Sequence, residues 1–200
     1  SASETITITV TGPTSQVTIA PADQPVAGQK IAIGAKNQVL GGFRINNQEN
    51  EAVVVSKVKF QMMCDPGSPG SSPGACGVEG IFLSDASGIV IAGPREPYRD
   101  PNDPARATIT FTDQFVINVG THDYFLRGNV IAQAQPGATI TISTVPGRDW
   151  AARGRVSGAV ITPAATTDVV VSHSVILIGG SLTIQVNDAI DKRVIAGAVG

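Results

Sequence analysis

The chain has 200 residues, of which 42% are hydrophobic, 15% charged and 4% aromatic, and its formal net charge is -2. This length suffices for one large all-β domain, or for one domain and part of a second. The absence of a Lys/Arg cluster excludes a nucleic-acid-binding surface, and no apolar run approaches the roughly 18 residues of a transmembrane helix.

Apolar and polar residues alternate with period two along much of the chain, which predicts β-strands with one face toward a core. The alternating segments are 5–11, 57–62, 107–112, 138–143 and 181–186, and we expect further strands at 38–45, 80–84, 88–92, 124–133, 155–161 and 175–178. No segment carries an apolar helical stripe over three turns. About ten strands with turn residues between them predict an all-β fold, an antiparallel β-sandwich.

Turn signals divide these strands. The segment from Asp85 to Gly88 lies between two short apolar strands and predicts a hairpin loop, in which Gly88 adopts a positive φ. Four prolines in 93–106 predict a long surface loop rather than a central strand.

A short sequence near the start of the chain returns near its end. Thr-Ile-Thr-Val at 7–10 is matched by Thr-Ile-Gln-Val at 183–186. One domain body cannot hold two copies of one strand in one place, so we expect one end strand to complete a neighbouring copy of the chain. The side chains expected to enter that neighbour's core are Ile6, Ile8 and Val10, or Leu182, Ile184 and Val186. The domain limits that follow are 1–25 for an N-terminal strand segment, 26–162 for the sandwich body, and 163–200 for a linker and closing strands. In the repeat interpretation the last segment is the start of a second repeat.

The two cysteines indicate the compartment. Cys64 and Cys76 flank a stretch of Gly, Pro and Ser that cannot bury apolar surface by itself. A bond between them would close a loop worth about 3 kcal/mol in the chain-entropy model. A zinc site fits badly because no His or third Cys is near, and two free thiols are the plain alternative. The expected disulfide implies a secreted, cell-surface or other extracellular protein.

Residues with catalytic potential are few, and we expect no catalytic residue, metal or cofactor. His122 and His173 are expected to be structural or to face solvent, and a carboxylate and a hydroxyl meeting either histidine in a cleft would reopen that question. Asp100 and Asp103 lack the ligand spacing of a calcium loop, so a solvated turn is expected there. Three scattered aromatic residues make a poor glycan site, so a glycan partner is unsupported: Tyr98, Tyr124 and Trp150.

Parts of the chain resemble the immunoglobulin-like repeats of large prokaryotic cell-surface proteins. The resemblance rests on Val-Leu-Gly-Gly-Phe-Arg-Ile at 39–45, the strand-like 51–60, the hairpin 81–88, and the closing segments 124–130 and 136–142. It covers roughly 26–162 and implies a secreted immunoglobulin-like β-sandwich in a surface layer, stalk or filament, with no catalytic residues.

Two functional classes follow from these observations. The first is a structural subunit or repeat of an extracellular assembly, such as a pilus-like fibre or a surface layer, that polymerises with copies of itself by strand sharing. The alternative is an adhesin or carbohydrate-binding module on the same sandwich. Both interpretations predict that the protein is not an enzyme.

Overall fold

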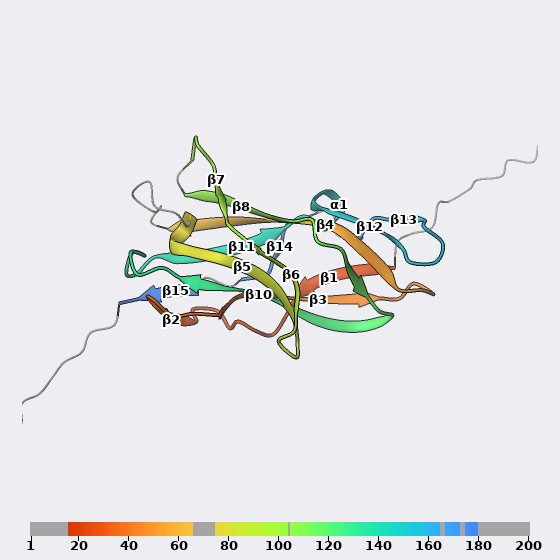
Figure 1. The fold of residues 1–200 in the computed structure, drawn as a ribbon, viewed down its shortest axis with the longest axis horizontal. Helices are drawn as coiled ribbons and strands as arrows, with labels where there is room; N and C mark the ends of the chain where they lie inside the picture. Colours follow the sequence, from red (N-terminus) through yellow and green to blue (C-terminus); the bar gives the residue numbers. More distant parts are fainter. Residues whose placement is uncertain (1–15, 66–74, 104, 165–166, 173–174, 180–200) are drawn as a thin grey trace, which may run out of the picture.

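The computed structural model describes residues 16–65, 75–103, 105–164, 167–172 and 175–179. Two β-sheets make up most of this structure, with fifteen strands, one short α-helix and one 3-10 turn in the described ranges. Figure 1 shows the strands as two layers along the long axis of the molecule. The predicted all-β class with two sheets is confirmed.

The smaller sheet contains five strands in the order β1-β3-β10-β5-β6, and all its pairings are antiparallel. Its strands are β1 (Val17–Pro21), β3 (Gln38–Asn47), β5 (Val78–Asp85), β6 (Val90–Arg95) and β10 (Gly120–Val130).

The larger sheet contains ten strands, and β4 at its centre pairs with β8, β9, β11 and β12. These strands are β2 (Lys30–Ala32), β4 (Val53–Asp65), β7 (Tyr98–Arg99), β8 (Arg106–Phe111), β9 (Phe115–Ile117), β11 (Thr139–Thr144), β12 (Trp150–Gly154), β13 (Val160–Ile161), β14 (Val169–Val170) and β15 (Val175–Ile178). Helix α1 (Pro146–Asp149) joins β11 to β12, and turn η1 (Ala75–Gly77) precedes β5.

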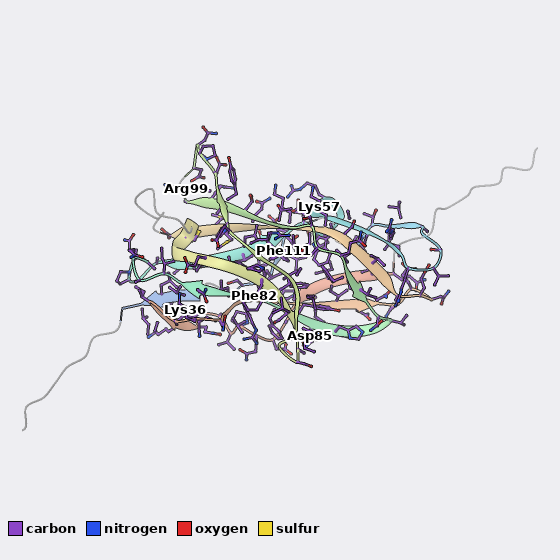
Figure 2. All side chains as sticks on the ribbon, in the orientation of Figure 1. Lys36, Lys57, Phe82, Asp85, Arg99 and Phe111 are labelled. Atoms are coloured by element: carbon purple, nitrogen blue, oxygen red, sulfur yellow. A yellow bond between two sulfur atoms is a disulfide. The ribbon has the colours of Figure 1, made fainter. Side chains whose placement is uncertain are left out.

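The core lies between the sheets and is built from the alternating side chains that the sequence indicates. Phe60 and Met62 of β4, and Ile109 and Phe111 of β8, are fully buried, while the residues between them are not. Figure 2 shows Phe111 near the middle of the molecule. At roughly 1.5–3 kcal/mol for each large side chain, this burial is the main stabilising contribution.

The structure corrects four details of the predicted fold. Strand β15 runs parallel to β2, so the pairing is not wholly antiparallel, and the strands exceed ten. Segment 93–106 is not one loop, because β6 continues to Arg95 and β7 pairs with β8. Pro94 lies in β6, an edge strand, where a missing N–H is tolerated. The predicted strand 155–161 is instead a turn and loop that follow β12 and lead into β13 at Val160–Ile161.

A disulfide joins Cys64 at the end of β4 to Cys76 in η1, as the sequence predicts, and both residues are buried. Within the described ranges no helix is long and apolar enough to cross a membrane. The six residues expected to form the shared end strands (Ile6, Ile8, Val10, Leu182, Ile184 and Val186) and the loop 66–74 lie outside the described residues.

Candidate functional site

A cleft of about 600 Å³ opens at one end of the sandwich, where the β5–β6 hairpin meets β9 and the start of β10. Its walls combine two carboxylates, one guanidinium, one histidine, one tyrosine, three small polar residues and three aliphatic residues. The lining residues are Arg44, Asp85, Ala86, Ser87, Ile91, Val116, Asn118, Thr121, His122, Asp123 and Tyr124.

The cleft exists because β10 is longer than its neighbour β5 at this end. Strand β5 ends at Asp85, which stands opposite Tyr124 of β10. Residues 120–123 of β10 continue beyond that point and pair only with β3 on their other side. Figure 2 shows Asp85 at the edge of the molecule, where β5 ends. The gap beside residues 120–123 of β10, where β5 has ended, is called the notch here. It leaves side chains of both sheet faces open to the cleft.

Three polar residues share the inner face of the smaller sheet at this notch. Directly paired residues of antiparallel strands place their side chains on one face, as do residues two apart on one strand. Asp85 is paired with Tyr124, and His122 lies two residues before Tyr124 on β10. All three residues line the cleft. A carboxylate, a phenol and an imidazole therefore approach one space from two strands.

Tyr124 is the buried member of this group. It is 6% exposed, and its ring contacts Phe43 (5.7 Å between centroids) and Phe115 (6.2 Å). Its hydroxyl has no hydrogen-bond partner among the described residues. Burial, and then the negative charge of Asp85, raise the pKa of Tyr124 to about 12. The hydroxyl oxygen has no described partner and is not fully enclosed, so it is available to a molecule in the cleft.

Asp85 holds the hairpin loop and keeps one oxygen free. Its Oδ1 accepts hydrogen bonds from the backbone N–H groups of Ser87 and Ile89, both at 2.9 Å. Gly88 adopts φ +85° in the same loop, which confirms the predicted hairpin turn. In the described part of the chain nothing hydrogen-bonds to Oδ2 of Asp85. One acceptor therefore shapes the loop, and the other is left for a ligand.

His122 presents a second free acceptor. Its Nε2 lies 3.3 Å from the carbonyl oxygen of Val119. A carbonyl can only accept, so in the neutral ring Nε2 carries the proton and Nδ1 is left as an acceptor. No described carboxylate or hydroxyl lies within hydrogen-bond distance of the ring, although Asp85 and Tyr124 line the same cleft.

On the outer face of the sheet, the guanidinium of Arg44 already has its ion-pair partners. Arg44 donates to both oxygens of Asp123, at 2.7 and 3.0 Å, and also to Asp23 at 3.0 Å. These contacts, the hydrogen bond with Asp123 first, raise the pKa of the Arg44 guanidinium above its ordinary value. Two carboxylates thus neutralise one guanidinium, and the charge of Asp85 is left without a cationic partner among the described residues.

Asn47 fixes the wall opposite the hairpin. This fully buried residue donates from Nδ2 to the carbonyl oxygens of Glu51, Ile117 and Asn118, at 3.1 to 3.3 Å, and its Oδ1 accepts from the N–H of Glu49. These bonds tie the β9–β10 connection to the end of β3. The cleft wall at Asn118 is therefore held by the sandwich itself, as a preformed site requires.

Two larger aliphatic residues, Val116 and Ile91, line the cleft. Val116, which lines the cleft, is 41% exposed, and Ile89 is 64% exposed. Val119 is 54% exposed and provides the carbonyl that contacts His122, while Ile89 donates its N–H to Asp85. Val119 and Ile89 thus adjoin polar groups of the site through their backbones, and both lie outside the cleft lining.

The other residues considered from the sequence are separated in the structure. Asp100 and Asp103 accept hydrogen bonds from the backbone of their own turns, and Asp103 also pairs with Arg106. Trp150 and Tyr124 are buried while Tyr98 is 70% exposed, so the three aromatic residues form no common platform. His173 lies outside the described residues.

A second cavity lies outside this cleft. A cavity of about 320 Å³ lies on the other sheet between β4, β8 and the loop after β7, and its lining includes Lys59, Met63, Tyr98 and Arg106. Among the described residues no group of three or more His, Cys, Asp and Glu side chains is placed to hold a metal ion.

Known proteins offer a distant structural likeness to this chain and no match in sequence. No protein-family model matches the chain, and neither does any curated protein. One similar solved structure is described as "AvmM Catalyzes Macrocyclization in Alchivemycin A Biosynthesis"; it is 9% identical, covers 86% of this chain and 93% of its own, and has a TM-score of 0.36.

This comparison contradicts two expectations from the sequence: that the chain is a structural subunit of an extracellular assembly, and that it is not an enzyme. The similar structure is described as a catalyst, so neither expectation is kept, and the adhesin or carbohydrate-binding alternative is not carried forward either. A TM-score of 0.36 is too low for the likeness to say what this chain acts on or how.

Proposed function

We propose that this protein binds a small organic molecule in the cleft beside the β5–β6 hairpin. The observation that carries the proposal is Tyr124, a buried residue whose hydroxyl has no partner among the described residues and which lines a cleft of about 600 Å³. That volume lies within the roughly 300–1,000 Å³ of small-molecule sites, which combine apolar walls with a few polar groups.

The proposal includes an extracellular location and an immunoglobulin-like arrangement of the two sheets. The Cys64–Cys76 disulfide supports the first, because such bonds persist mainly in oxidising compartments. Two mostly antiparallel sheets around one core support the second, while the parallel pairing of β15 with β2 departs from a purely antiparallel arrangement.

The test is a fragment screen against the whole chain by amide chemical shifts, with cationic, neutral and anionic fragments. Bound fragments should shift the amides of 85–91 and 116–124. A Ser87→Trp variant should lose this binding, because an indole on the exposed hairpin turn fills the cleft without entering the core.

Gln133→Trp is the matched control. Gln133 is also an exposed turn residue, beyond the far end of β10, so its indole should leave fragment binding unchanged. The proposal is wrong if no fragment class shifts the cleft amides, or if the shifts gather instead around the second cavity.

A further inference from the structure

We infer that the molecule taken by this cleft is an amphiphilic amine, with its ammonium group between Asp85, Tyr124 and His122 and its apolar part against Val116 and Ile91. This inference rests on the proposed function and names the chemical class of its ligand. It depends on three features of the cleft: the sign of its charge, the kind of hydrogen-bonding atoms left free, and the apolar rim.

The charge of the cleft favours a cation. Arg44 is the only cationic side chain among the lining residues, and it is held by Asp123 and Asp23. The carboxylate of Asp85 has no such counter-charge, and its field reaches the phenol of Tyr124. An anionic ligand would meet uncompensated negative charge, and a cationic ligand supplies the missing partner.

The free atoms at the base of the cleft are acceptors, or a hydroxyl that can accept. They are Oδ2 of Asp85, Nδ1 of the neutral His122 ring and the phenol oxygen of Tyr124. A primary ammonium has three donors and no acceptor, so it can satisfy all three atoms. Hydrogen bonds that involve a charged group are roughly twice as strong as neutral ones.

The rim indicates what the rest of the ligand must be. Val116 and Ile91 line the cleft, and Val116 is 41% exposed. An alkyl or ring system attached to the ammonium would cover these side chains. Each CH₂ group removed from water there should strengthen binding about fourfold.

The experiment measures dissociation constants of the whole chain for hexylamine, methylamine, hexanol and hexanoate by amide-shift titration at pH 7. Hexylamine should bind at least tenfold more tightly than each of the others, with shifts at 85–91 and 116–124. Asp85→Asn should weaken hexylamine binding roughly tenfold to hundredfold, since hydrogen bonds to charged groups contribute that much, and should weaken hexanol binding far less, because hexanol carries no charge. The Asn side chain retains the Oδ1 acceptor that holds the turn.

Asp100→Asn is the matched control, because Asp100 also accepts a backbone N–H within an exposed turn but lies outside this cleft. It should bind all four probes like the wild type. Hexanol or hexanoate binding as tightly as hexylamine, or an unchanged hexylamine affinity in Asp85→Asn, would overturn the amine inference while the cleft remained a binding site. A cleft that binds neither these probes nor any library fragment overturns both proposals.

Discussion

Phe43 lies between two aromatic residues that each carry one polar group, and their surroundings differ. The ring of Trp150 meets Phe43 edge to face at 5.7 Å between centroids, and the ring of Tyr124 stacks on it at the same distance. Both residues are less than 8% exposed. The Trp150 Nε1 donates to Oγ1 of Thr144 at 3.0 Å, but the Tyr124 hydroxyl has no described partner.

The difference separates a polar group that stabilises the core from one that is open to a ligand. Thr144 is fully buried, and its hydroxyl accepts from Trp150 and donates to the carbonyl oxygen of Lys59 at 2.8 Å. Each polar group in this series of hydrogen bonds has a partner, as buried polar groups in a stable core do. Tyr124 lies at the open end of the same core, where its hydroxyl reaches the cleft. The same aromatic cluster thus stabilises the fold on one side and presents a polar group on the other.

The largest effect is expected when Phe43 itself is removed. Phe43→Ala takes away a fully buried ring that contacts Phe60, Tyr124 and Trp150 and should lower the free energy of unfolding by about 3–5 kcal/mol. Urea denaturation followed by the fluorescence of Trp150, the single tryptophan, measures this loss. Phe82→Ala is the control, because Phe82 is only half-buried, and it should cost clearly less. Equal losses would show that the ring contacts around Phe43 contribute nothing special.

An intermediate effect is expected on the Trp150 side. Thr144→Val keeps the shape of the side chain but leaves the Trp150 N–H and the Lys59 carbonyl oxygen without their shared partner. The free energy of unfolding should fall by about 1–3 kcal/mol. Thr141→Val, on the solvent side of the same strand, should change it by less than about 0.5 kcal/mol. If the two variants unfold at the same urea concentration, the buried hydrogen bonds do not stabilise the core.

The fold was predictable where the two faces of a strand differ in polarity. The alternation in β4 and β8 is plain in the sequence because Phe60, Met62, Ile109 and Phe111 are separated by Lys, Gln and Thr. Strand β12 was missed because its inward residues after Trp150 are only Ala152 and Gly154, which give little apolar signal. Strand β9 has three apolar residues in a row and no alternation.

The cleft was predictable only in its local part. The hairpin at Asp85 follows from adjacent turn residues, and the structure confirms it. The pairing of Asp85 with Tyr124 depends instead on strand register, which is set by long-range packing of the two sheets. The sequence predicted this strand only from Tyr124 onward, yet β10 begins at Gly120 and includes His122. Only the register places these three residues at one notch.

The smallest effect on stability is expected on the cleft side. Tyr124→Phe removes a hydroxyl without a described partner, so the free energy of unfolding at pH 7 should change by less than about 0.5 kcal/mol. The same substitution should weaken hexylamine binding, because an acceptor at the base of the cleft is lost. A loss of stability as large as that of Thr144→Val would mean that the Tyr124 hydroxyl is structural after all.

At high pH the free energies of unfolding of Tyr124→Phe and the wild type should differ. Burial, and then the charge of Asp85, raise the pKa of Tyr124 to about 12 in the folded protein, above the roughly 10 of an unfolded chain. As pH rises above about 10 the unfolded chain loses this proton first, so Tyr124 destabilises the folded state progressively until its folded pKa is passed. The Phe variant has no such proton. The two proteins should therefore unfold at equal urea concentration at pH 7, and the wild type should become the less stable one between about pH 10 and 12. Equal stability of the two proteins at both pH values would show that the phenol of Tyr124 is solvated like that of an unfolded chain, and the site would then lack its partly buried hydroxyl.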